Sequence, residues 1–292
     1  MFYASSLRMF ELMKALFLLL SLVLATFCAS AQINVSVTMK QEEFLPGESV
    51  PVYVHVTNRS GQNLHLGDDN SWLTFLVESD DGFIVIKKSD PPVIGAFDLG
   101  SQEVATKRVD LAPNFILTRN GRYKVTATLH IKAWSTDVSS PPTKFDVIQG
   151  AEIWSQVFGV PDPAATNAPP RVRKYTLVQA NYLSDQLRLY IQVSDAGGGG
   201  LKVRAIGPMI SFGQPEAQVD PISNLHILYQ DGASAFTYAV VNPDGDIIQQ
   251  EVYDYVSTRP RLTQDSNGNI SVYGGVRRVE TPDVETPAAL SR

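Results

Sequence analysis

Histidine and serine are the first candidates for chemistry, because they supply many of the bases, metal ligands and nucleophiles of hydrolases. Each of the four histidines is followed by an aliphatic residue, so none begins the H-E-x-x-H pattern of zinc proteases. They are His55, His65, His130 and His226. No G-x-S-x-G sequence marks a nucleophilic serine, and the Gly197–Gly200 run lacks the lysine of a phosphate-binding loop. We therefore assign no catalytic or cofactor-binding residue.

Metal binding is the next possibility, and the spacing argues against a shared site. His55 and His130 occupy polar positions of two alternating segments. A two-sheet sandwich places those segments in opposite sheets, with the imidazoles pointing apart. Asp68–Asn70 and Asp80–Asp81 contain oxygen ligands suited to calcium, but such stretches are far more often simple turns. His226 fits a structural role better than a metal-binding one, and we predict no metal site.

Three side chains near the C-terminus have the spacing of a sugar-binding face. Glu251, Tyr253 and Tyr255 alternate along the chain, so they share one face of a strand. Exposed tyrosine rings spaced in this way stack against sugars, whereas partly buried ones pack between neighbouring sheets. Packing is the favoured interpretation, and the binding residues stay unknown.

The N-terminal segment predicts export. Arg8 and Lys14 precede an apolar run from Ala15 to Cys28, and small residues up to Ala31 follow it. This is the arrangement of a cleaved secretory signal peptide, and a run of fourteen residues is too short to span a bilayer comfortably. We expect residues 1–31 to be removed near Ala31, which makes the protein periplasmic or secreted.

Composition narrows the class further. Cleavage near Ala31 removes Cys28, the single cysteine, and so excludes disulfides, thiolate catalysis and cysteine-bound zinc. Without Arg8, Glu11 and Lys14 the 24 basic and 30 acidic residues fall to 22 and 29, a net charge of −7. The dispersed charges favour solubility and argue against a nucleic-acid partner. No later segment is long and apolar enough to predict a membrane span.

Residues 32–149 are predicted to form an antiparallel β-sandwich. From Ile33 onward apolar and polar residues alternate, which is typical of strands with one buried face. Turn signals such as Pro46–Gly47 and Asn120–Gly121 separate about seven such segments. The segments are Ile33–Met39, Val50–Val56, Trp72–Val77, Phe83–Ile86, Val104–Leu111, Tyr123–Ile131 and Phe145–Ile148.

This domain resembles a known family in three stretches, PGESVPVYVHVTNRSG, WLTFLVESDDGFIVI and NGRYKVTATLHI. They are similar to the immunoglobulin-like domains of exported bacterial proteins, and more distantly to macroglobulin-type and proteinase-inhibitor sandwiches. The resemblance implies a tyrosine corner at Tyr123, whose hydroxyl ties a loop to the strand. It implies protease inhibition only weakly, because no reactive loop is recognisable.

Residues 150–174 are predicted to be a proline-rich linker. Four prolines lie among small residues between Gly159 and Pro170, a composition typical of an extended connector. Ala151–Phe158 is expected to pair with a neighbouring domain or to form a short helical turn. Trp154 is expected to pack at an interface between the two halves of the chain.

Residues 175–276 are predicted to contain β-repeats. Alternating segments begin at Leu187, Leu225 and Ile270, spaced by 38 and 45 residues, which is within the range of propeller blades. We interpret each unit as an antiparallel meander whose first strand follows an Asp-containing turn. Asp220 and Asp265 are expected to accept backbone N–H bonds in these turns.

These turns resemble the Asp-boxes of sialidase-like β-propellers, although their glycine positions differ and the first unit has Tyr182 in place of Asp. A sialidase-like site needs converging arginines, and the spacing here does not predict convergence. The arginines concerned are Arg188, Arg204, Arg259 and Arg261. About two and a half blades of roughly 40 residues fit this length, and a propeller usually needs four or more. We favour a compact monomer over a ring completed by several chains.

Residues 277–292 are predicted to be a disordered tail, because they are polar and proline-containing. Together these features predict an exported, non-enzymatic binding or scaffolding protein of the cell envelope or exterior. Its partner is expected to be a protein or a polysaccharide. Two alternatives stay open: a glycan-acting hydrolase with a degenerate propeller, and a protease inhibitor.

Overall fold

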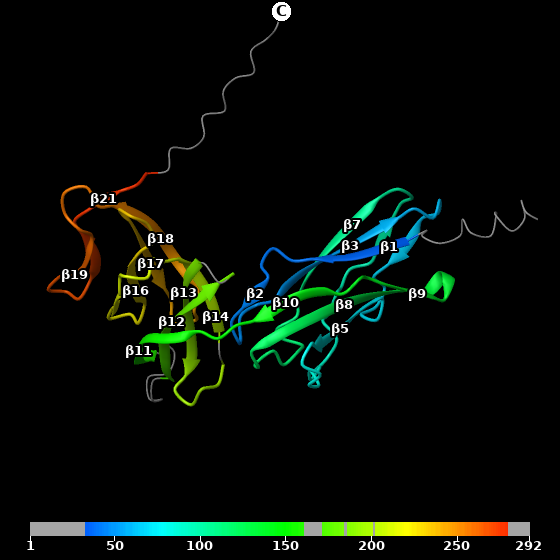
Figure 1. Cartoon of the computed structure of the whole chain (residues 1–292), viewed down its shortest axis with the longest axis horizontal. Helices are drawn as coiled ribbons and strands as arrows, with labels where there is room; N and C mark the ends of the chain where they lie inside the picture. The colour runs from blue at the N-terminus through cyan, green and yellow to red at the C-terminus, as the bar shows by residue number, and fades with distance from the viewer. Residues whose placement is uncertain (1–32, 161–170, 184–185, 201, 280–292) are drawn as a thin grey trace, which may run out of the picture.

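The computed structural model describes residues 33–160, 171–183, 186–200 and 202–279. Their regular structure is β throughout apart from one 3-10 turn, Lys132–Trp134, so the predicted all-β fold is confirmed. Figure 1 shows two β bodies side by side along the long axis of the molecule. We call them the sandwich domain (β1 to β10) and the repeat domain (β11 to β21). The predicted signal peptide, residues 1–31, lies outside the described residues.

The sandwich domain contains two main sheets. Sheet I has the strand order β1-β3-β7, which are Ile33–Thr38, Pro51–Asn58 and Val104–Asp110. Sheet II has the order β2-β10-β8-β5 with β9 also beside β8, which are Glu43–Phe44, Thr143–Val147, Gly121–Ile131, Leu73–Ser79 and Thr136–Ser139. A short antiparallel pair that the sequence did not predict joins β4 (Leu64–Leu66) to β6 (Phe97–Leu99).

Alternation along the strands builds the core of this domain. In β1, β3 and β8 every second residue is buried, and the residues between are mostly half-buried or exposed. One face of each sheet is therefore apolar, and the two faces enclose a single hydrophobic cluster. The sequence predicts these strands correctly, because apolar and polar residues alternate with a period of two when one face of a sheet is buried and the other is exposed to solvent.

One predicted strand in this domain is wrong. Phe83–Ile86 has the alternating pattern but belongs to no sheet. Its chain runs instead beside the loop after β7, where the Ile116 N–H donates to the Ile86 carbonyl and the Lys88 N–H donates to the Asn114 carbonyl. The alternation therefore reflects one apolar side, which packs on the core, without the ladder of hydrogen bonds that defines a strand.

Tyr123 makes the contact expected of a tyrosine corner. Its side chain is fully buried and stacks on Phe145, with ring centroids 5.4 Å apart. Its hydroxyl donates to the carbonyl of Arg119, four residues upstream, at 2.7 Å. Burial raises the pKa of this hydroxyl, which keeps it a donor. The loop before β8 is thereby tied to the strand.

The repeat domain begins inside the segment predicted as a linker. Sheet III has the order β11-β12-β13-β14, which are Ala151–Val160, Arg171–Tyr182, Gln186–Asp195 and Lys202–Pro208. Of the two alternatives for Ala151–Phe158, the short helical turn is wrong and pairing with a neighbouring domain is confirmed, because this segment pairs with β12 and Phe158 stacks on Tyr175 with centroids 4.1 Å apart. Trp154 packs on the core of the repeat domain, not at the junction of the two domains. Residues 161–170 lie outside the described residues.

A second meander and a hairpin follow. Sheet IV has the order β15-β16-β17-β18-β21, which are Glu216–Val219, Leu225–Gln230, Ala235–Val241, Ile247–Asp254 and Val276–Arg277. The hairpin pairs β19 (Arg261–Gln264) with β20 (Ile270–Tyr273). The predicted tail starts too early, because Arg277 lies in β21 and Arg278 pairs with Asp254. Residues 280–292 lie outside the described residues.

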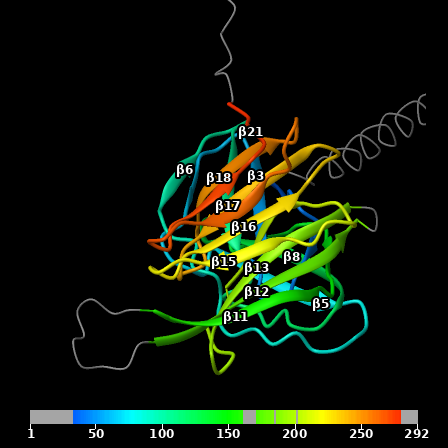
Figure 2. The ribbon, with the colours of Figure 1, turned by 90° about the vertical axis from the view of Figure 1, so that its left-hand side faces the viewer.

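The sheets of the repeat domain are stacked in layers along the long axis of the molecule (Figure 1), and Figure 2 looks at them face-on. The inner core lies between sheets III and IV. The outer core lies between sheet IV and the β19–β20 hairpin. The opposite face of sheet III meets the sandwich domain in a third group of buried residues, which we call the junction cluster: Leu45, Val178, Ala180, Tyr190 and Val203. Each central sheet is therefore covered on both faces.

Candidate binding groove between the two domains

The junction between the domains is close-fitting at Gly150, which directly precedes β11. A Cβ atom on this residue would lie 2.2 Å from Cγ1 of Val178 and 3.2 Å from Cδ2 of Leu45. The backbone can therefore pass between the two domains only without a side chain. Glu48 and Val203 add a parallel backbone bridge across the same junction.

Glu48 is an unusual acid because it is buried at this junction, with 7% of its surface exposed. Its Oε2 accepts the Leu45 N–H at 2.8 Å and its Oε1 accepts an N–H of Gln41 at 3.1 Å. Burial raises the pKa of the carboxyl, and the Leu45 hydrogen bond lowers it in part. Both oxygens are used to hold the turn between β2 and β3, so the group serves the fold.

The Tyr190 hydroxyl is the second buried polar group here. Its side chain is fully buried in the junction cluster, and the hydroxyl has no hydrogen-bond partner among the described residues. Burial raises its pKa to about 12, and the nearby charge of Glu48 raises that pKa further while Arg188 lowers it. The hydroxyl is therefore neutral at ordinary pH.

A groove of about 960 Å³ lies beside this junction. We call it the basic groove. Apolar residues of both domains form its floor: Leu45, Val50, Phe115, Leu117, Val147 and Val203, all less than 9% exposed. Charged residues at its sides are Glu48, Lys88, Arg108, Asp110, Lys202 and Arg204. A concave site of this size at a domain interface has the dimensions of ligand sites.

The acidic residues of the groove are engaged locally, whereas two of its four basic residues, Lys88 and Arg108, face solvent. Asp110 accepts the Ser49 hydroxyl at 2.6 Å and the Val50 N–H at 2.8 Å. Lys88 and Arg108 are exposed and form no ion pair with another described residue. The groove therefore offers a positive surface, which attracts anions.

The other two cations of the groove share one carboxylate. Lys202 Nζ and Arg204 Nη2 each lie 2.8 Å from the same oxygen, Oδ1 of Asp246. Hydrogen bonding from Lys202 is the largest cause that lowers the pKa of Asp246. Asp246 ends the turn between β17 and β18, so this contact joins sheet IV to the edge of sheet III.

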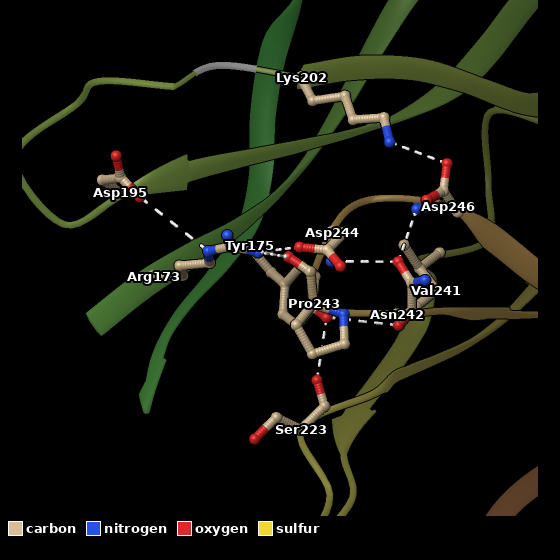
Figure 3. A network of polar contacts seen from close by, with 10 residues as sticks. All are labelled: Arg173, Tyr175, Asp195, Lys202, Ser223, Val241, Asn242, Pro243, Asp244 and Asp246. Carbon is tan, nitrogen blue, oxygen red and sulfur yellow. Dashed lines mark hydrogen bonds and ion pairs between the residues drawn. The ribbon is translucent and has the colours of Figure 1, made fainter. Parts of the chain in front are cut away.

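The same turn is held from a second side (Figure 3). Arg173 of β12, 17% exposed, donates to the Pro243 carbonyl at 2.5 Å and to Asp244 at 2.7 Å. The Tyr175 hydroxyl donates to the Ser223 carbonyl at 2.9 Å, and the Val241 carbonyl lies 3.3 Å from the same hydroxyl. Sheet III therefore fixes the loops of sheet IV through charged and polar contacts as well as through the inner core.

Four hairpin loops of the repeat domain have one geometry. In each, the first residue donates its N–H to the carbonyl four residues later and accepts an N–H from three residues later. The loops are Asp195–Gly199, Asp220–Asn224, Asn242–Asp246 and Asp265–Asn269. The third residue after the start has a positive φ in every loop. Glycine provides that conformation in three of them.

The turn role predicted for two aspartates is confirmed. Asp220 accepts the N–H groups of Ile222 and Asn224, and Asp265 does the same two and four residues later. The predicted position is wrong in one respect. The turns do not open a unit, because each joins the first strand of a hairpin to the second: β15 to β16 and β19 to β20.

Ser223 replaces glycine in the second loop. Its φ is 71°, and its hydroxyl donates to the Gly159 carbonyl of β11 at 2.8 Å. This contact fastens the β11–β12 hairpin to a loop of sheet IV.

His226 has the structural role that the sequence predicts. Its Nδ1 lies 2.6 Å from the Tyr238 hydroxyl and its Nε2 lies 3.1 Å from Oδ2 of Asp220. The imidazole is 8% exposed, so both nitrogens are satisfied inside the outer layer. Burial raises the pKa of Tyr238 to about 12, which keeps this hydroxyl protonated.

The structure separates the two histidines considered as metal ligands. His55 lies on β3 of sheet I between Thr38 and Thr106, and His130 lies on β8 of sheet II between Thr74 and Asp137. Their placement in different sheets matches the prediction. No group of three or more His, Cys, Asp or Glu residues in the described part of the chain is placed to hold a metal ion.

The acidic stretches near β4 and β5 serve as turns and ion pairs. Asp69 caps the backbone at Ser71 and pairs with Lys132, whose hydrogen bond lowers the pKa of Asp69 to about 2. Asp68 pairs with His65, whose other nitrogen contacts Asp98 at 2.6 Å. These hydrogen bonds raise the pKa of His65.

The four arginines considered for a sialidase-like site do not gather on one carboxylate. Arg188 stacks over Tyr182 and Arg204 pairs with Asp246. Arg259 lies over Phe236 and Arg261 pairs with Glu216. Each arginine therefore has its own partner.

The tyrosines of the strand β18 region behave differently from one another. Tyr253 packs against the outer core and donates to Glu251 at 2.9 Å, as the packing interpretation predicts. Tyr255 follows the end of β18 and is 49% exposed.

The groove residues escape sequence reasoning because they come from separate turns and strand ends. The turn at Pro46–Gly47 is recognisable, but nothing in the sequence relates Lys88 or Arg108 to Lys202, which lies in the other domain. The one sequence feature that could have singled out Lys202 and Arg204 is that both are basic residues near the end of a predicted strand.

Comparisons with known proteins add little. No family model matches this chain, and no curated protein matches it. Among solved structures, one similarity is to Spo0M, a sporulation control protein from Bacillus subtilis, at 13% identity and a TM-score of 0.30. That match covers 61% of this chain and 91% of the other. Within the described ranges, no helix has the length and apolar character to cross a membrane.

Proposed function

We propose that this chain is an exported, non-enzymatic binding protein whose anionic ligand, carried by a partner protein or a polysaccharide, lies in the basic groove. One observation carries the proposal: four cations of two domains line the groove, and two of them, Lys88 and Arg108, are exposed without an ion pair to another described residue, while the two acids are occupied by the turns that they hold. The more accessible apolar residues of the groove, such as Pro113 and Ile116, provide contact area, and the charged sides provide orientation. The predicted signal peptide supports a place in the cell envelope or exterior.

Charge reversal in the groove tests the proposal. Lys88→Glu combined with Arg108→Glu replaces two exposed cations that have no ion-pair partner among the described residues. We expect binding of the protein to protein and polysaccharide fractions of the cell envelope to fall at least tenfold in a pull-down titration, because both charges face the ligand.

A matched control carries the same change of charge elsewhere. Lys40→Glu combined with Lys144→Glu alters two exposed residues outside the groove, and binding should stay within about twofold. Equal losses in both variants would reduce the effect to net charge and reject the groove. Hydrolysis of a glycan at enzymatic rates by the unaltered protein would reject the non-enzymatic role.

A further inference from the structure

The contact between Asp246 and two groove cations has the form of an occupied anion site. Lys202 and Arg204 converge on one oxygen of Asp246, and the other oxygen of this carboxylate contacts neither of them. The three side chains are between 39% and 47% exposed, so the contact lies at the surface of the groove. Exposed ion pairs of this kind contribute little to stability.

The turn that carries Asp246 does not need this side chain to keep its shape. Asn242 donates its N–H to the Asp246 carbonyl at 2.9 Å, and the Asn242 side chain accepts the Asp246 N–H at 2.8 Å. Arg173 holds the turn separately through Pro243 and Asp244. The carboxylate of Asp246 is therefore free to be exchanged for another anion while its backbone stays in place.

We infer that Lys202 and Arg204 form a carboxylate-binding subsite of the basic groove, which the chain fills with its own Asp246 until an acidic segment of a partner protein replaces it. This inference rests on the proposed function and names the ligand class. The exchange is non-covalent: two ion pairs to Asp246 are lost, and two to the incoming carboxylate are formed. An arginine offers a carboxylate two parallel N–H groups, and a lysine adds a point charge beside it.

An acidic protein segment fits the groove better than an acidic polysaccharide. Sugar-binding sites commonly present exposed aromatic rings, and Phe115, the one aromatic residue among the described groove residues, is 2% exposed. The accessible apolar surface comes instead from residues such as Pro113 and Ile116, which suit aliphatic side chains between acidic ones. Lys88 and Arg108 provide further cations for an acidic run.

The test measures binding of a fluorescent ten-residue oligoglutamate to the full chain by anisotropy at low salt. We expect Asp246→Asn to bind about three- to tenfold more tightly than the unaltered protein, because the internal competitor has lost its charge. Lys202→Gln combined with Arg204→Gln should bind at least tenfold more weakly, and adding Asp246→Asn to this pair should restore nothing. The gain should shrink as salt increases.

Asp244→Asn is the matched control, because Asp244 lies in the same turn but pairs with Arg173 outside the groove. Its binding should stay within about twofold of the unaltered protein. An unchanged or weaker affinity for Asp246→Asn, with an unchanged circular dichroism spectrum, overturns the inference. So does an equal gain for Asp244→Asn.

Oligogalacturonate of equal charge separates the ligand classes. Weaker binding than oligoglutamate supports the protein segment, and equal or tighter binding overturns it. The proposed function is tested by a different observation: it is rejected if the unaltered protein does not bind the envelope fractions. If those fractions bind through Lys88 and Arg108 while Asp246→Asn has no effect, the function stands and the subsite does not.

Discussion

The two domains bury their strands in different ways. In β8 of the sandwich domain, buried and less buried residues alternate over the whole strand. In β16 and β17 of the repeat domain, almost every residue is buried. Sheet II has a core on one face, whereas sheet IV lies between the inner and outer cores. Stacking sheets in layers therefore removes the wet face that alternation requires.

Neighbouring alanine substitutions should give the largest contrast between the domains. Ile227 faces the inner core and Leu228 faces the outer core. Ile227→Ala and Leu228→Ala should each lower the free energy of unfolding by about 2–5 kcal/mol. In β8, Leu129→Ala should cost a similar amount, and Thr128→Ala should change stability by less than about 0.5 kcal/mol. Urea unfolding of the four variants measures this, and a mild effect of Leu228→Ala would break the comparison.

The junction that unites the two kinds of domain should respond to a single methyl group. Gly150→Ala places Cβ against Val178 and Leu45. The domains must then move apart or the local packing must be strained, and either change should lower the free energy of unfolding by about 1–3 kcal/mol. Small-angle scattering should show a larger radius of gyration. Gly197→Ala, in a loop where a Cβ meets no atom within 4 Å, is the control. Unchanged scattering and stability for Gly150→Ala would mean that the junction is loose.

Two equivalent turns of the repeat domain should differ in their importance. Asp220 holds its turn and also contacts the buried His226, so Asp220→Ala should lower the free energy of unfolding by about 1–3 kcal/mol. Asp265 makes the same turn contacts at an exposed position. Asp265→Ala should therefore lower the free energy of unfolding, and with it the melting temperature, by less than Asp220→Ala does. Thermal unfolding ranks the two. Equal effects would show that His226 contributes nothing to the difference.

The smallest expected effect is a pH dependence at Glu48. Burial raises the pKa of this acid above its usual value of 4.5, so the folded protein holds the proton more tightly than the unfolded chain does. Stability should therefore fall as pH rises from 4.5 through the raised pKa. Glu48→Gln should lack this fall, so its stability relative to the unaltered protein should increase across that window. Urea unfolding at several pH values measures the difference, and parallel curves would contradict the shift.

Much of the fold could be predicted because a strand with one solvent-exposed and one buried face has polar and apolar residues that alternate with a period of two. That period identifies β1, β3 and β8, and the Asp220 and Asp265 turns follow from side chains that accept N–H bonds. It misleads at Phe83–Ile86, where one side is apolar but no partner strand exists.

The β11 strand and the groove could not be predicted in this way. In β11 most residues are exposed or half-buried, and its proline-rich continuation resembles a linker. The groove depends on how two domains meet at Gly150, which places Lys202 beside residues more than ninety positions earlier. That arrangement depends on tertiary packing, which no local pattern encodes.

The Ser223 contact has a mechanical consequence. Because the Ser223 hydroxyl holds Gly159 and the Ser223 carbonyl holds Tyr175, both strands of the β11–β12 hairpin are anchored to a loop of sheet IV. A force that pulls on this hairpin is therefore shared with the neighbouring layer. Separating the hairpin from sheet IV therefore requires both of these hydrogen bonds, one on each strand, to break together with the packing of the inner core.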